Sequence, residues 1–137
     1  MSTVVAVAAA TLAQFAVGAF WYSVPFAKTW GRIHGFDKLP KARQQELMKE
    51  QGPYYFHQLI VTIIAAAVLT RLIQLLPHYS AYTLAALVWL GFIVPTQVSG
   101  ILFGNDDKKV FWVKLGILAG GSLACTLVGA AVIKAVL

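Results

Sequence analysis

Residues 3–22 read TVVAVAAATLAQFAVGAFWY, a run without a single charged side chain. At 1.5 Å per residue, a helix of this length spans about 30 Å, which matches the hydrocarbon core of a bilayer. Nothing basic precedes the run, and it is longer than the apolar core of a cleaved signal peptide. We therefore expect a retained membrane helix at this position.

Three more apolar runs follow the first, at residues 55–76, 81–103 and 110–137. The whole chain is 59% hydrophobic and 12% charged, against about 45–50% and about 25% in soluble domains. So few charges cannot solvate the surface of a small soluble domain, whereas a surface that faces lipid needs none. The sequence predicts an all-α integral membrane four-helix bundle that forms one domain over residues 1–137.

Basic residues are concentrated on one side of these four spans. Residues 23–54 carry six of them, residues 104–109 carry Lys108 and Lys109, and Lys114 follows just inside the fourth span. The other side has only Arg71 and Lys134. Because basic loops stay in the cytoplasm, loops 23–54 and 104–109 are expected there, in the inner or plasma membrane, with both termini outside. The same topology explains the net charge of +6 without a nucleic-acid partner.

The first loop is the only long polar segment, and residues 39–51 within it predict a short helix. Pro40 suits a first helical position, and Gly52 suits the stop. Leucine and methionine side chains form a thin apolar edge beside basic positions. Two roles fit this pattern, a helix lying on the anionic inner leaflet and a solvated connector.

The first and third spans also share a faint pattern. Each has an aromatic and apolar stretch that ends in proline, FWYSVP at 20–25 and LGFIVP at 90–95. Both spans run from outside to inside, so the bundle could consist of two parallel-repeated helix pairs. The matching positions are few, and chance explains them equally well.

The segment WYSVPFAKTW at residues 21–30 resembles a signature of domain-of-unknown-function family 1761, small bacterial and fungal membrane proteins with Trp-Tyr-Ser-Pro followed by Phe-Gly-Lys-x-Trp. WLGF at 89–92, followed by Pro95 and by Leu102-Phe103, is similar to the family's second signature. Here Pro25 falls one place later and Ala27 replaces glycine. The resemblance covers nearly the whole chain and implies four spans in this loop order, but no activity.

Polar side chains inside the spans are costly in lipid and are expected to face protein or a cavity. Several lie at similar depth near the cytoplasmic side, where a bundle would gather them into one polar pocket. The candidate pocket residues are Trp21, Tyr22, His57, Gln58, Pro95, Gln97, Ser99 and Lys114. His57 is either a group that handles protons or substrate, since imidazole titrates near neutral pH, or a simple interhelical hydrogen-bond partner.

The fourth span carries small residues at four-residue spacing, which allow helix backbones to approach closely in lipid. This predicted packing face consists of Gly116, Gly120, Gly121, Cys125 and Gly129. It fits packing within the chain and an interface between copies of the chain equally well.

Signatures of metal, cofactor or catalytic chemistry are weak. One cysteine and three scattered histidines predict no metal site, and no cofactor motif occurs. The adjacent Asp106 and Asp107 are typical of a turn that offsets Lys108 and Lys109.

Three functions remain for this membrane protein. The sequence favours an oligomer, expected to be a homo-oligomer, that transports an unidentified small solute or ion. The alternatives are an accessory protein that binds partner helices and, less favoured, a membrane enzyme acting on a lipophilic substrate.

Overall fold

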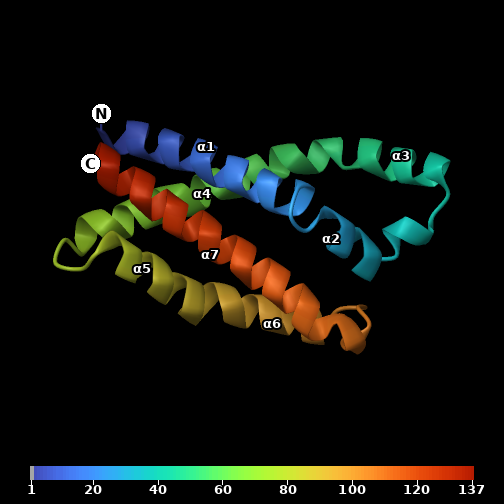
Figure 1. The fold of residues 1–137 in the computed structure, drawn as a ribbon. Coiled ribbons are helices and arrows are strands. Elements are labelled where there is room, and N and C mark those ends of the chain that lie inside the picture. The colour runs from blue at the N-terminus through green and yellow to red at the C-terminus, as the bar shows by residue number, and fades with distance from the viewer. Residues whose placement is uncertain (1) are drawn as a thin grey trace.

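The computed structural model describes residues 2–137, which form a bundle of long helices (Figure 1). The spans are α1 (Ser2–Ser23), α4 (Gly52–Leu75), a third helix made of α5 (Ala81–Val88), η2 (Trp89–Ile93) and α6 (Val94–Leu102), and α7 (Phe111–Val136). All four are long and apolar enough to cross a membrane. The predicted all-α class with four apolar helices is confirmed.

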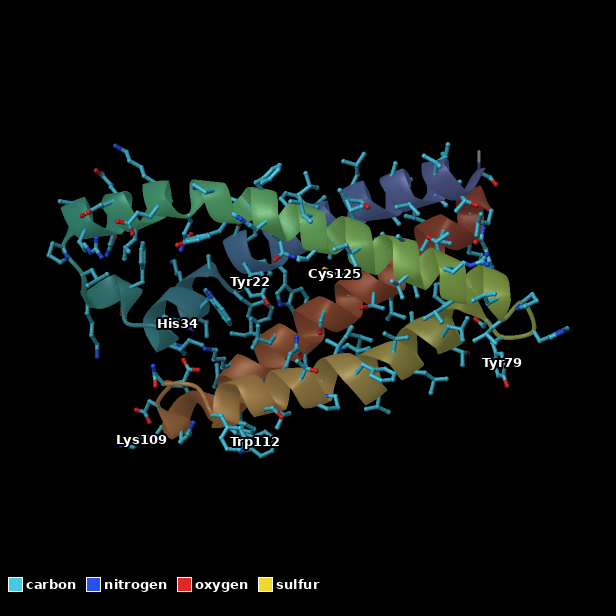
Figure 2. All side chains as sticks on the ribbon, turned by 180° about the vertical axis from the view of Figure 1, so that it is seen from behind. Tyr22, His34, Tyr79, Lys109, Trp112 and Cys125 are labelled. Carbon is cyan, nitrogen blue, oxygen red and sulfur yellow. The ribbon has the colours of Figure 1, made fainter. Side chains whose placement is uncertain are left out.

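Short helices connect these spans at one end of the bundle, namely α2 (Ala27–Ile33), η1 (Phe36–Lys38), α3 (Lys41–Glu50) and η3 (Lys108–Val110). Gly35, with φ of 74°, lets the chain turn between α2 and η1, a backbone conformation that favours glycine. Segments 24–51 and 103–110 are called the basic end from here on. Figure 2 shows His34 and Lys109 at this end and Tyr79 at the opposite one, and the two chain termini lie together at the opposite end in Figure 1.

Helix α3 occupies most of the segment that the sequence predicts as helical, beginning one residue after Pro40 and ending at Glu50. None of its residues is buried, and Arg43 pairs with Glu46 at 3.1 Å on its exposed surface. In Figure 1, α3 continues roughly along the direction of α4, away from the bundle. The two roles that the sequence leaves open for this helix, a connector and a helix lying on the leaflet, both stay predictions.

The half of the bundle away from the basic end is closed by a core of mostly small side chains. The buried cluster consists of Ala6, Ala10, Ala66, Leu69, Ala81, Ala85, Ala130 and Ile133. Alanines at the contacts of α1, α4, α5 and α7 let the backbones approach closely, which replaces the hydrophobic drive that lipid removes. Helix α7 lies against the other three spans and forms the centre of the fold.

The third span is not a regular helix, because a π-helical turn, η2, precedes Pro95. The N–H of Val94 donates to the carbonyl of Trp89, five residues back instead of four. Proline has no N–H and its ring crowds the carbonyl one turn earlier, so a wider turn just before it relieves the conflict. The extra residue changes which side chains face α7 beyond this point.

Candidate functional site

A cavity of about 1320 Å³ lies in the half of the bundle nearer the basic end. Its walls come from α1, α4, the η2–α6 segment and α7, and its rim includes Trp30 and Gln51. Figure 2 shows Tyr22 and Cys125, two of the lining residues, in the interior between the helices. The volume exceeds the roughly 300–1,000 Å³ typical of ligand pockets, so the space suits an organic molecule rather than a bare ion.

On the α1 wall, Gln14 is only 8% exposed and forms a hydrogen bond across the bundle. Its Nε2 donates to the backbone carbonyl of Cys125 at 3.2 Å. A Cβ atom at Gly129 would overlap the Gln14 amide, so glycine there leaves room for the side chain in this position. Because a carbonyl only accepts, this bond fixes the amide orientation. The buried Oε1 of Gln14 then has no hydrogen-bond partner within residues 2–137.

A second amide, that of Gln97, is held in the same way on the α6 wall. Its Nε2 lies 3.3 Å from both the carbonyl of Leu118 and the Oγ of Ser122. Trp89 Nε1 donates to Ala119 O at 2.8 Å and to the same Oγ at 3.2 Å. The Oε1 of Gln97 is also buried without a partner among the described residues.

The π-turn explains why Trp89 and Gln97 meet one side chain of α7. Residues eight apart in a regular α-helix are offset by about 80° around the axis. A π-turn contains one residue more than an α-helical turn. Residues eight apart across such a turn are therefore offset by only about 20°, as residues seven apart are in a regular α-helix. The proline-associated turn therefore brings both side chains to Ser122.

The structure brings some predicted pocket residues together at the cavity. Tyr22, Gln58 and Gln97 line it, and so do Gly121 and Cys125 from the predicted packing face. The Gln58 Nε2 lies 3.3 Å from the hydroxyl of Thr62, which in turn donates to the carbonyl of Gln58 at 2.7 Å.

The other predicted pocket residues lie outside this lining. His57 is exposed, with Nδ1 2.9 Å from the Pro53 carbonyl of its own helix, because it projects from the outer side of α4. Pro95 and Ser99 are also exposed. The Trp21 indole instead fills a notch on α7 and donates to Ile117 O at 2.9 Å.

The small-residue face of α7 packs within the chain. A Cβ at Gly120 or at Gly121 would lie 2.9 Å from the Trp21 ring. The Cys125 Sγ lies 3.5 Å from the carbonyl of Gln14, in contact with α1. At Gly116, by contrast, an added Cβ would meet no described atom within 4 Å. The sequence leaves open whether this face packs within the chain or between copies of the chain. In the structure, α1 of the same chain occupies the face from Gly120 onward.

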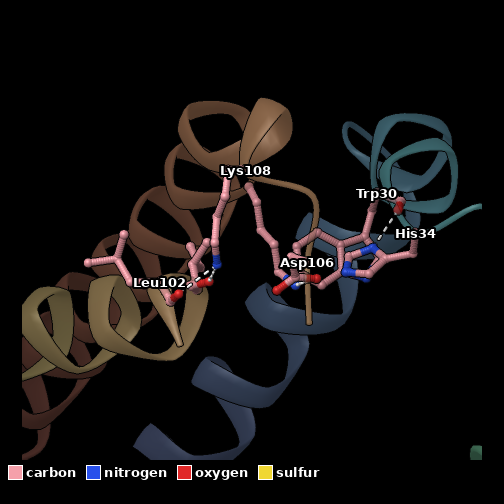
Figure 3. Close-up of polar contacts among 7 residues, drawn as sticks. Trp30, His34, Leu102, Asp106 and Lys108 are labelled. Atoms are coloured by element: carbon pink, nitrogen blue, oxygen red, sulfur yellow. Dashed lines mark hydrogen bonds and ion pairs between the residues drawn. The ribbon is translucent and has the colours of Figure 1, made fainter. Parts of the chain in front are cut away.

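Lys114, the remaining candidate, contacts Asp106 of the loop after α6 and Trp30 of α2. Figure 3 shows Asp106 and Trp30 close to each other in this polar cluster. The Nζ of Lys114 lies 2.8 Å from Asp106 Oδ1 and 5.7 Å from the centre of the Trp30 ring. The hydrogen bond from Lys114 lowers the pKa of Asp106 below its ordinary value, and the charges of Lys114, His34 and Lys108 act in the same direction. Lys108 Nζ donates to Leu102 O at 2.6 Å at the end of α6. These contacts hold Trp30 at the cavity rim.

Wall residues that were not sequence candidates for the site include Trp30, Ser122 and Thr126. Gln14 and Thr62 also line the wall; the sequence predicts that they face protein or a cavity, but it does not place them in the candidate pocket. Gln14 and Thr62 are polar residues within apolar runs, a signal that the sequence carries. Ser122 and Thr126 give no such signal, because small hydroxyl residues often bond their own helix, as Thr126 does to Ser122 O at 2.6 Å.

A family model described as "Protein of unknown function (DUF1761)" matches residues 5–133, nearly the whole chain. The chain belongs to this family. The resemblance seen in the segment at residues 21–30 is thereby confirmed. No curated protein and no solved structure matches the chain. Membership of DUF1761 supplies no activity, so a functional argument rests on the cavity.

Proposed function

We propose that this DUF1761 protein transports a small solute across the membrane and that the cavity is its solute site. One observation carries the proposal: the bundle is hollow in one half and closed in the other. The rim residues Ser23, Gln51 and Tyr54 are exposed at the basic end. The alanine-rich core closes the opposite half. This asymmetry is typical of a carrier captured open to one side.

The alternatives have less support from the geometry. The enzyme hypothesis relied on His57 as acid or base, and that side chain lies away from the cavity. The accessory hypothesis relied on the small face of α7, which α1 occupies from Gly120 onward, or on the loop helix α3, whose residues are not buried. A homo-oligomer stays a prediction from the sequence, and the proposed site does not require one, because a single chain supplies four of its walls.

The basic loops supply the orientation of the proposed carrier. With loops 23–54 and 104–109 in the cytoplasm of a cell with an inner or plasma membrane, the rim at the basic end opens inward. Solute would then enter or leave the cavity on the cytoplasmic side, and transport requires a second state in which the alanine-rich half opens instead.

Cys125 provides a test, because it is the only cysteine of the chain and it lines the cavity. In liposomes with a known protein orientation, a small impermeant thiosulfonate reagent is added to one side at a time. We expect rapid modification of Cys125 from the basic end. A carrier that alternates between two states also shows slower, temperature-dependent modification from the opposite side.

Two variants make this measurement specific. Cys125→Ser removes the signal, and Ala65→Trp, which places a large ring in the α4 wall, slows modification from the basic end. A Cys125 that reacts only from the basic end at every temperature would reduce the protein to a binding protein and overturn the transport proposal.

A further inference from the structure

Among the described residues, the cavity wall carries no carboxylate, amine, guanidinium or imidazole group; its ionisable groups are tyrosine phenols and the thiol of Cys125. The lining residues among the described part of the chain include no Asp, Glu, Lys, Arg or His, although eleven Lys and Arg occur in the sequence. A charged ligand would leave water for an apolar surface without a counter-charge, which is strongly unfavourable. The chemistry of this wall therefore selects an uncharged molecule.

Two residues of the wall also carry a hydrogen-bond acceptor without a partner among the described residues. The Oε1 atoms of Gln14 and Gln97 are buried and unpaired, and both residues line the cavity. Their Nε2 groups donate to α7, so the oxygen is the atom of each amide that still lacks a partner. The side chain must shift for this buried oxygen to reach a donor in the cavity, and the soft terminal amide torsion permits such a shift if the Nε2 contact lengthens. A ligand that carries a hydroxyl or N–H group would satisfy these oxygens.

The rest of the lining suits an apolar body. Six aromatic side chains contribute to it, namely Phe15, Tyr22, Trp30, Tyr54, Tyr55 and Phe92. A molecule held by such a wall and by a few convergent amide groups is amphipathic, with most of its surface apolar.

Between α4 and the η2–α6 segment, part of the cavity wall is formed by exposed side chains. Val61 and Phe92 both line the cavity and are exposed, 52% and 73% respectively. Each lies near the middle of its span, so in a bundle that crosses a membrane this side of the cavity faces the hydrocarbon core and not the aqueous loop side. Helix α4 packs chiefly against α1, and α6 against α7, which leaves this side of the bundle open.

From these four observations we infer that the ligand is an uncharged, hydroxyl-bearing lipophilic molecule that enters the cavity from the lipid between α4 and η2–α6. A monoacylglycerol represents this chemistry. The inference rests on the proposed function only in taking the cavity as the solute site.

Three photoreactive probes with the same acyl chain test this inference on the intact protein in phosphatidylcholine nanodiscs at pH 8. They are a monoacylglycerol, which is neutral with donors, a fatty acid methyl ester, which is neutral without donors, and the free fatty acid, which is anionic. Cross-linked peptides are identified by mass spectrometry. We expect the monoacylglycerol to label segments 54–65 and 92–97 at least fivefold more than either other probe.

Matched variants then identify the groups responsible. Gln14→Leu and Gln97→Leu each remove an amide from the wall and are expected to lower monoacylglycerol labelling at least threefold. Gln74→Leu is the control, because Gln74 lies on α4 outside the cavity and bonds the hydroxyl of Thr3 at 2.8 Å. If a cavity variant fails to fold, the comparison of the three probes on the unchanged protein still decides.

The outcomes separate this inference from the proposed function. Equal labelling by the ester and the monoacylglycerol overturns the role of the amide oxygens, and preferential labelling by the fatty acid overturns neutrality. Suppression of labelling by excess glycerol in water overturns entry from lipid in favour of a soluble solute. None of these results affects Cys125 modification from both sides, which tests transport alone.

Discussion

At the scale of single residues, the fit between α1 and α7 depends on glycines that face large side chains. Trp21 is held by a notch at Gly120 and Gly121 and by its hydrogen bond to Ile117 O. A rigid indole ring in a close-packed notch cannot move aside for an added methyl group, whereas a flexible side chain can. Gly116, one turn away on the same helix, faces open space, so the two positions should respond oppositely to the same substitution.

We predict that Gly121→Ala destabilises the protein by about 1–3 kcal/mol, because the new methyl group would lie 2.9 Å from Trp21 Cδ1 and Nε1. Gly116→Ala is expected to be neutral or to stabilise by up to about 1 kcal/mol, since alanine is the better helix former. Unfolding in detergent, followed by circular dichroism, measures both. Equal effects of the two substitutions would contradict the intrachain notch.

At the scale of elements, the π-turn η2 sets the register of the third span against α7. It allows Trp89 and Gln97 to bond the same Oγ of Ser122, at 3.2 and 3.3 Å. It also places Phe92 and Ile93 in the cavity wall. The sequence shows Pro95 directly, but its structural consequence lies in the turn before it and not at the exposed ring itself.

Two changes in the length of the third span, both made in a Pro95→Ala variant, are expected to have opposite results. Removing Gly91 turns the wide turn into a regular helix while keeping Trp89 and Gln97 on one face, so folding and the contacts with Ser122 should persist. Inserting an alanine after Gly91 rotates Gln97 by about 100° away from Ser122. We expect only the insertion to lower the unfolding temperature substantially and to expose Cys125 to faster thiol modification. Equal tolerance of both changes would contradict the register.

At the scale of the whole molecule, one half of the bundle is packed by alanines and the other half is hollow and lined by aromatic and amide side chains. Both basic loops lie at the hollow end, as Figures 1 and 2 show. The location of the proposed site relative to the cell therefore follows from the charge of the loops, and it can be tested without knowing the ligand.

We predict that, in a Cys125→Ser background, Lys109→Cys reacts with an impermeant maleimide only from the cytoplasm and His78→Cys only from outside, because basic loops are retained in the cytoplasm. Intact cells and inverted vesicles provide the two sides. The reverse pattern would place the cavity rim outside and turn the proposed carrier around, whereas labelling of both positions from both sides would indicate a chain that inserts in two orientations.

The sequence by itself determined the class of fold and the gross arrangement of charge. Uncharged runs of about 20 residues, such as residues 3–22 and 81–103, can satisfy their own backbone in lipid within the segment only as helices, so composition and length suffice to predict spans. The motif at residues 21–30 was also enough to indicate the family, because it is local in sequence.

Only the tertiary structure decided which polar residues share a site. His57 and Gln58 are neighbours in sequence, yet a helix turns by about 100° per residue and only Gln58 faces the cavity. Gln14 and Cys125 meet across 111 positions of sequence, and no local pattern encodes that contact. The oxygens of Gln14 and Gln97 are left unpaired because the amide nitrogens of both residues donate to carbonyls of α7. These hydrogen bonds depend on how three helices pack together.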